Sequence, residues 1–385
     1  MVSAMQSLGF LYNCVVSLLL FFATTSCCHA ESNNHTALFV FGDSVYDPGN
    51  NDFLNISIVY KANFPPYGET FFKFPTGRFS DGRLIPDFVA KHANLPYWKP
   101  YLAPGHHEFV NGANFASAGS CVLTESDPNT INLHMQLRYF KNVSSSLKQQ
   151  LGETKAKKLL KNAVYLFSSG GNDCWLFEFT KPNATQSQKQ EYTNLVIGNI
   201  TEVFKEIHKA GGRKFAFQNI AFMDCQPETK QSYGLNEDEC YQDISELALL
   251  LNNALANATR QLETQLPGFK YSIFDYYNLL FDMTYNPSKY GLKVVESACC
   301  GTGTYRGSDC GISDYDLCSD PSTYMYWDGE HLTEYVNSQV VEQLWNGGTN
   351  ISSPFNMKQL FELELDAEIQ IKNASEYDNG ALADE

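Results

Sequence analysis

The chain has 385 residues with 43% hydrophobic and 14% aromatic content, which is ample for a large packed domain and excludes a mostly disordered protein. Its formal net charge of −16 at pH 7 argues against nucleic acid, or an anionic membrane surface, as the main partner. Acidic residues gather near the C-terminus, so residues 356–385 are expected to form a flexible acidic tail.

The N-terminus carries the pattern of a cleaved signal. Residues 15–23 are an apolar run that is too short to span a bilayer. The residues Cys28-His29-Ala30 that follow are typical of a signal-peptidase site. We therefore predict a signal peptide over residues 1–30, secretion of the mature chain, and no transmembrane anchor.

Strand-like and helix-like segments then alternate along the chain. Short apolar runs at 37–41, 164–167, 214–218 and 271–274 are typical of buried parallel strands. Apolar residues at helical spacing predict helices over 196–207 and 244–262, and a third that opens at His331 and continues to residue 344. This alternation predicts a single α/β domain over residues 31–355, with a mainly parallel central sheet.

Cysteines and sequons agree with export. Loss of the signal peptide would leave an even number of cysteines, as expected for disulfides in an oxidising compartment. Their spacing lacks a CxxC pair or a neighbouring histidine pattern, so no metal site is predicted. The disulfide candidates are Cys121, Cys174, Cys225, Cys240, Cys299, Cys300, Cys310 and Cys318. The candidate glycosylation sites are Asn34, Asn55, Asn142, Asn183, Asn199, Asn257, Asn350 and Asn373.

Ser44 follows the first predicted strand, in the sequence Phe41-Gly42-Asp43-Ser44. Ligands of parallel sheets bind at the carboxyl ends of strands, so a nucleophile could lie here. A serine in this position is more often a helix N-cap, and the G-x-S-x-G motif of α/β-hydrolases is absent from the chain. Ser44 alone is therefore weak evidence of catalysis.

A base and its orienting carboxylate could come from one turn near the C-terminus. Asp328 stands three residues before His331, and a catalytic serine needs an imidazole base that a carboxylate usually orients. Two turns in the middle of the chain, Phe115 to Gly119 and Gly170 to Asp173, could supply oxyanion donors from glycine N–H groups or the Asn172 amide. Each of these motifs alone occurs often by chance.

Taken together and in order, these motifs resemble the GDSL (SGNH) hydrolase family, in particular its plant branch. The resemblance covers about residues 37 to 347. It rests on five blocks: Phe41 to Ser44 with Asp47 to Asn51, Gly77 to Arg83, Asn114 to Gly119, Gly171 to Asp173, and Trp327 to Thr333.

The resemblance implies a three-layer SGNH-hydrolase-like fold and a role for each matching residue. Ser44 would be the nucleophile, His331 the base and Asp328 its orienting partner. The oxyanion hole would be formed by the Ser44 and Gly119 N–H groups and the Asn172 amide. No cofactor is implied, and the plant branch suggests the apoplast, with the vacuole as an alternative.

Three functions fit these observations. The leading hypothesis is a monomeric serine esterase or lipase that cleaves small-molecule or lipid esters through an acyl-enzyme. An acyltransferase would use the same acyl-enzyme but pass the acyl group to a hydroxyl acceptor of a specialised metabolite. A catalytically silent binding glycoprotein is the third, and the intact set of catalytic residue types argues against it.

The implied oxyanion hole also leads to a disulfide prediction. Cys121 lies two residues after Gly119, and Cys174 lies two residues after Asn172. If both donors contact one oxygen, their loops run close together, and a Cys121–Cys174 disulfide could join them. The other six cysteines would still pair evenly, with Cys225 and Cys240 closing a short loop.

Overall fold

The computed structural model describes residues 36–105, 108–123 and 130–365. The predicted signal peptide, Asn34, Asn373 and the tail beyond residue 365 lie outside these residues. None of the helices in the described part of the chain combines the length and apolar character needed to cross a bilayer.

A six-stranded sheet forms the centre, in the order β2-β1-β3-β4-β5-β8. The first five strands run parallel and β8 is antiparallel at one edge. Every residue of β1, β3 and β4 is buried, which explains their continuous apolar runs. The strands are β1 (Leu38–Gly42), β2 (Gly112–Asn114), β3 (Val164–Ser168), β4 (Lys214–Gln218), β5 (Lys270–Phe274) and β8 (Ser352–Ser353).

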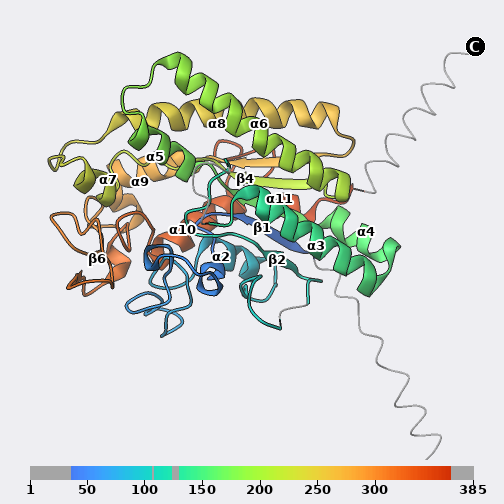
Figure 1. The fold of residues 1–385 in the computed structure, drawn as a ribbon, viewed down its shortest axis with the longest axis horizontal. Coiled ribbons are helices and arrows are strands. Elements are labelled where there is room, and N and C mark those ends of the chain that lie inside the picture. Colours follow the sequence, from blue (N-terminus) through green and yellow to red (C-terminus); the bar gives the residue numbers. More distant parts are fainter. Residues whose placement is uncertain (1–35, 106–107, 124–129, 366–385) are drawn as a thin grey trace, which may run out of the picture. The chain divides into compact units, whose positions relative to one another are not determined.

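Helices cover both faces of this sheet, so the chain has the predicted three-layer α/β fold (Figure 1). One layer contains the adjoining helices α3 (Leu133–Leu151), α4 (Glu153–Asn162), α6 (Gln186–Ala210) and α8 (Gln242–Gln265), with α5 (Gly171–Thr180) against α8. The other contains α2 (Ile85–His92), α10 (Glu334–Asn346) and α11 (Met357–Glu362). The shorter α7 (Pro227–Ser232) and α9 (Tyr276–Tyr285) lie near the ends of β4 and β5.

The domain extends beyond residue 355, where the sequence analysis placed the start of a flexible tail. Helix α11 packs against α10, β4 and β5. Its apolar residues Met357 and Leu360 are fully buried, and Leu365 is 5% exposed. These side chains anchor residues 356–365 to the core, which corrects the predicted boundary.

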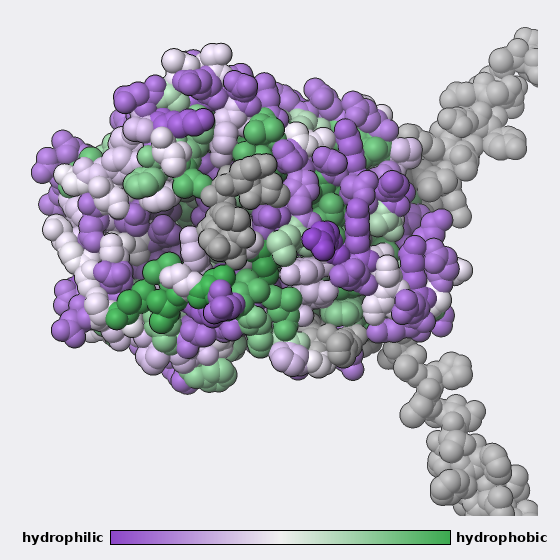
Figure 2. All heavy atoms as spheres, in the orientation of Figure 1, coloured by the Kyte–Doolittle hydropathy of each residue, from purple (hydrophilic) through white to green (hydrophobic). Residues whose placement is uncertain are grey.

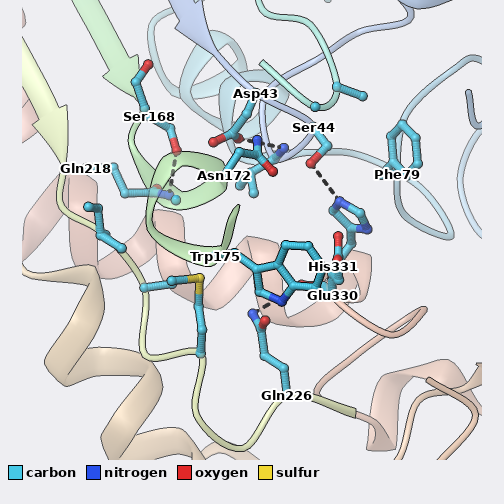
Figure 3. A pocket seen from close by; sticks show the side chains of 18 of the residues that line it. Asp43, Ser44, Phe79, Ser168, Asn172, Trp175, Gln218, Gln226, Glu330 and His331 are labelled. Atoms are coloured by element: carbon cyan, nitrogen blue, oxygen red, sulfur yellow. Dashed lines mark hydrogen bonds between the residues drawn. The ribbon is translucent and has the colours of Figure 1, made fainter. Parts of the chain in front are cut away.

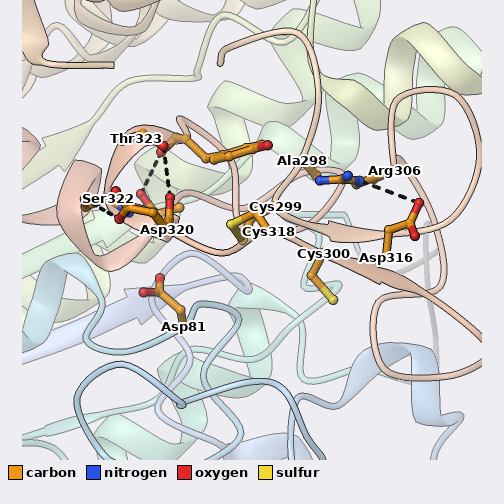
Figure 4. The surroundings of a disulfide bond; sticks show 12 residues. Asp81, Ala298, Cys299, Cys300, Arg306, Asp316, Cys318, Asp320, Ser322 and Thr323 are labelled. Atoms are coloured by element: carbon orange, nitrogen blue, oxygen red, sulfur yellow. Dashed lines mark hydrogen bonds and ion pairs between the residues drawn. A yellow bond between two sulfur atoms is a disulfide. The ribbon is translucent and has the colours of Figure 1, made fainter. Parts of the chain in front are cut away.

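Three disulfides form among the described residues. Cys225–Cys240 matches the pairing expected from the sequence. Cys299–Cys318 and Cys300–Cys310 cross-link a loop region that carries the two-stranded sheet of β6 (Cys300–Gly301) and β7 (Asp316–Leu317) (Figure 4).

The predicted Cys121–Cys174 disulfide is wrong, because both residues are buried thiols. Cys174 Sγ lies 3.5 Å from the Ile244 carbonyl oxygen, so it faces α8. Cys121 Sγ lies 3.9 Å from the carbonyl oxygen of Gly119. Asn172 and Cys174 both belong to α5, and two residues along a helix turn a side chain by about 200°. Cys174 therefore points away from the loop that Asn172 faces.

Candidate active site

Ser44, His331 and Asp328 form one hydrogen-bonded chain at the carboxyl end of β1. Figure 3 shows its bond between Ser44 and His331. Ser44 Oγ lies 2.7 Å from His331 Nε2. His331 Nδ1 lies 2.7 Å from Asp328 Oδ1 and 3.0 Å from Oδ2. The three residues are each less than a tenth exposed. The structure thus joins Ser44 to a histidine 287 positions away, in the arrangement that a serine nucleophile requires.

Burial and charge shift the pKa values of Asp328 and His331 in opposite directions. Burial alone would raise the pKa of Asp328, but the charge and hydrogen bond of His331 hold it below its ordinary value. Burial would lower the pKa of His331, yet the charge and hydrogen bond of Asp328 raise it. The pair is therefore arranged to stabilise an imidazolium next to Ser44.

The turn that carries Asp328 and His331 is fixed by its own backbone. Asp328 Oδ1 accepts the N–H groups of Glu330 at 3.0 Å and His331 at 2.8 Å. The Trp327 N–H donates to the His331 carbonyl at 2.7 Å. Helix α10 begins only at Glu334, with Thr333 as its N-cap, so His331 precedes the helix that it was predicted to open.

The disulfide-linked loop region holds the same turn from outside. The N–H groups of Cys299 and Cys300 donate to the carbonyls of Tyr326 and Trp327, at 3.0 Å and 2.7 Å. Each of these cysteines is disulfide-bonded, to Cys318 and Cys310 respectively. The two cross-links therefore support the segment immediately before Asp328.

Two aromatic residues to which the sequence pattern assigned no role contact Asp328 and His331. Tyr67 OH donates to Asp328 Oδ2 at 2.8 Å. The Phe79 ring lies 4.7 Å from the His331 ring, centroid to centroid. Both contacts span more than 250 residues of sequence, so no local pattern could have revealed them.

The Gly77 to Arg83 block ties this part of the chain to α10. Asp81 Oδ1 accepts the Glu334 N–H at 2.6 Å, at the start of the helix. Arg83 pairs with the Glu334 carboxylate at 2.6 Å. These bonds fix Phe79 against His331, which gives a structural reason for a block that contributes no residue to the chain of Ser44, His331 and Asp328.

Ser44, Gly119 and Asn172, which carry the three candidate oxyanion donors, line one pocket. Within the described chain, the backbone N–H groups of Ser44 and Gly119 have no hydrogen-bond acceptor. Asn172, in the first turn of α5, donates to the Ser120 carbonyl at 3.0 Å. A side-chain amide has two N–H groups, so one is left for a ligand.

Glycine is required at position 119. Its φ of +74° lies in the left-handed region, and an added Cβ would come within 2.6 Å of the Tyr60 ring. A larger residue would displace either the pocket wall or the backbone N–H. The close approach therefore explains why the turn ends in glycine.

The segment after Ser44 clamps this glycine turn. Asp47 Oδ2 accepts the Ala118 N–H at 2.9 Å. Asn50 Nδ2 donates to the Asn114 and Ala116 carbonyls, at 3.1 Å and 2.8 Å. Asn51 Nδ2 donates to the Ala118 carbonyl at 2.9 Å. The polar residues of the first block thus set the position of Gly119.

Asp173 fixes the other side of the same loop. Its two carboxylate oxygens accept the N–H groups of Val122 at 2.7 Å and Leu123 at 3.1 Å. Burial raises its pKa to about 6, against the effect of these two donors. Asp173 therefore joins α5 to the Gly119 loop. The sequence had predicted that a Cys121–Cys174 disulfide would make this connection.

The pocket beside Ser44 has a volume of about 430 Å³. Val59, Tyr60 and Phe79 line it, and so do α5 and the segment after β4, which contribute Trp175, Leu176, Ile220 and Met223. Figure 3 shows Phe79 and Trp175 among these residues. In the described residues, no group of three or more His, Cys, Asp or Glu is arranged as a metal site.

The described sequons differ in their surroundings. Asn55, Asn142, Asn183 and Asn350 are exposed. Asn199 is half-buried, and its Oδ1 lies 2.8 Å from His134 Nε2. Asn257 is exposed and accepts a hydrogen bond from Arg260.

Comparison with known proteins shows the family to which this chain is similar. The family model of the GDSL-like lipases and acylhydrolases matches residues 38–344. GDSL esterase/lipase 5 of Arabidopsis thaliana is 43% identical, over 92% of this chain and 96% of its own. A GDSL lipase of Tanacetum cinerariifolium is also 43% identical, over 94% and 96% of the two chains.

A further relative differs in its description. Inactive GDSL esterase/lipase-like protein 25 of Arabidopsis thaliana is 37% identical, over 88% of this chain and 78% of its own. Relatives of this chain thus include one described as inactive. On the match of the family model and these identities, the chain belongs to the family of GDSL-like lipases and acylhydrolases.

Proposed function

We propose that this chain is a secreted serine esterase that cleaves carboxylic esters through an acyl-enzyme. The observation that carries the proposal is the continuous hydrogen-bonded chain from Ser44 Oγ through His331 to Asp328. His331 takes the Ser44 proton as Oγ attacks the ester carbonyl, and then gives it to the leaving alkoxide. Water completes the cycle by attacking the acyl-enzyme, again with His331 as the base.

The oxyanion of each tetrahedral intermediate would be held by the N–H groups of Ser44 and Gly119 and by the Asn172 amide. Donors that are already oriented cost no reorganisation when charge develops on the oxygen. The unpaired state of the two backbone N–H groups supports this assignment. The position of Asn172 in the first turn of α5 adds the positive end of a helix dipole.

Apolar surface near the pocket supports an ester with an apolar portion. Phe53, Ile58 and Val59 are about half exposed, and Val59 also lines the pocket. Figure 2 shows hydrophobic surface gathered in a band across the middle and lower part of this face. A small-molecule or lipid ester, bound by a monomer, is the substrate class that we propose.

Secretion is part of the proposal. It is supported by the signal-like N-terminus, by three disulfides, and by five described sequons whose asparagines are exposed. The proposed location is the apoplast, with the vacuole as the alternative.

Acyl transfer to a hydroxyl acceptor is the alternative outcome of the same chemistry. The acyl-enzyme would be identical, and the pocket has space beside Ser44 for an acceptor other than water. Products made in water alone and with an added alcohol therefore decide between the two.

The test uses purified, secreted protein with 4-nitrophenyl esters of several acyl lengths. We expect catalytic turnover that Ser44→Ala abolishes, and that Ser145→Ala, an exposed serine of α3, leaves unchanged. Free acid as the main product with alcohol present indicates the esterase, whereas a new ester indicates the transferase. A wild-type protein without turnover on any ester would contradict both.

A further inference from the structure

Apart from His331, the charged side chains that line the pocket around Ser44 are carboxylates. Among the described residues that line the pocket there are two carboxylates, Asp43 and Glu330, and no lysine or arginine. The only residue there that can carry a positive charge is His331, whose ring is engaged by Ser44 and Asp328. An anionic substrate would therefore meet negative charge without a cation to bind it.

Glu330 is the carboxylate that a substrate would meet first. The residue is exposed and lies beside His331 at the rim of the pocket (Figure 3). Its backbone is fixed at both ends, since its N–H donates to Asp328 Oδ1 and its carbonyl accepts from Gln226 Nε2. Its carboxylate has no hydrogen bond or ion pair with any described residue.

A second carboxyl, that of Glu228, lies next to the turn that carries Glu330. Glu228, at the start of α7, is attached to the same turn because its N–H donates to the Gly329 carbonyl at 2.9 Å. Its carboxylate accepts a hydrogen bond from Ser232 at 2.6 Å, and within the described chain it has no cationic partner. Glu228 therefore adds a second carboxyl next to the turn that presents His331, outside the lining of the pocket.

We infer that the pocket selects uncharged and cationic esters over anionic ones, and that Glu330 sets this preference. The inference rests on the proposed esterase function and names the class of substrate for that same site. Like charges several ångströms apart repel strongly in a partly desolvated pocket, and salt weakens the effect only in part. Glu330 is a specificity-determining residue here, and it forms no bond to the reacting atoms.

The test compares three 4-nitrophenyl esters whose acyl chains have equal length and end in a methyl, a carboxylate or a trimethylammonium group. Desolvation raises the pKa of Glu330 to about 7, so kcat/KM is measured at pH 8 and low salt, where most of this carboxyl is ionised. Each value is divided by the rate constant for hydroxide-catalysed hydrolysis of the same ester, which corrects for the intrinsic reactivity of that ester. We expect the anionic ester to fall roughly fivefold or more below the neutral one, and the cationic ester to equal or exceed it.

Variants assign the effect to Glu330. Glu330→Gln should raise the anionic-to-neutral ratio of kcat/KM roughly fivefold, and Glu330→Asp, which keeps the charge, should retain most of the discrimination. The matched control is Glu153→Gln, at the start of α4 and outside the pocket, which should leave the ratio unchanged.

The outcomes separate the inference from the function on which it rests. Absence of turnover on the neutral ester by wild type would contradict the proposed function. Turnover of the neutral and anionic esters at equal corrected rates would overturn the inference alone. An unchanged ratio in Glu330→Gln would remove Glu330 as its cause.

Discussion

At the scale of single residues, the candidate site depends on contacts from residues outside the chain of Ser44, His331 and Asp328. Asn172 combines two tasks, because its amide can face an oxyanion while it also bonds to the Ser120 carbonyl. Tyr67 donates to Asp328 from a distant part of the chain. The residue types for nucleophile, base and orienting acid were visible in the sequence, whereas Tyr67 and Phe79 were not, since their roles exist only in the folded chain.

Asn172→Ala should lower kcat roughly a hundredfold or more and change KM little, because one donor to the developing oxyanion is lost. Steady-state kinetics on a 4-nitrophenyl ester provide the measurement. A thermal unfolding curve separates this effect from damage to the Ser120 loop. An unchanged kcat would remove Asn172 from the oxyanion hole.

Tyr67→Phe should lower kcat/KM roughly tenfold, because Asp328 loses a hydrogen bond that holds its carboxylate in place. The matched control is Tyr277→Phe, which removes a hydroxyl bonded to Ser245 at 2.7 Å and outside the pocket. Both variants lose one buried hydrogen bond, but only the first should alter catalysis. Equal kinetics for the two would show that Tyr67 has no positioning role.

At the scale of elements, the spacing of apolar residues in the sequence predicted the main strands and the long helices. Four strands and two long helices lie where apolar runs and helical spacing placed them. The start of α10 was wrong by three residues because Asp328 Oδ1 takes the His331 N–H, and Thr333 caps the helix instead. The tail boundary was wrong because acidic composition concealed the apolar residues of α11.

Leu360→Ala should reduce the free energy of unfolding by about 2–5 kcal/mol, since it leaves a cavity between α11 and the core. Lys358→Ala, an exposed residue of the same helix, should change it by less than about 0.5 kcal/mol. Urea unfolding of both variants checks this. Similar values for the two would mean that α11 does not belong to the domain.

At the scale of the whole molecule, buried acids make stability depend on pH. Burial raises the pKa of Asp43, Asp173 and Asp224 to about 6 and that of Asp47 to about 7. Between pH 4 and 7 the folded chain therefore binds more protons than the unfolded chain, so the free energy of unfolding falls as pH rises. Repulsion among the charges that give a net −16 acts in the same direction.

Urea unfolding should accordingly give a free energy at pH 5 that is higher than at pH 7.5 by at least about 1 kcal/mol. Asp224→Asn should make this difference smaller, because one raised carboxyl is removed. A free energy of unfolding that increases from pH 5 to pH 7.5 would contradict the account of these buried acids.

The central claim is that Ser44 is the nucleophile, and covalent labelling tests it most directly. The purified protein is treated with a fluorophosphonate, and the modified peptide is identified by mass spectrometry. We predict one adduct, on the peptide that contains Ser44, with loss of esterase activity in proportion to labelling and no adduct in Ser44→Ala. An adduct on another serine, or full esterase activity in Ser44→Ala, would contradict the account.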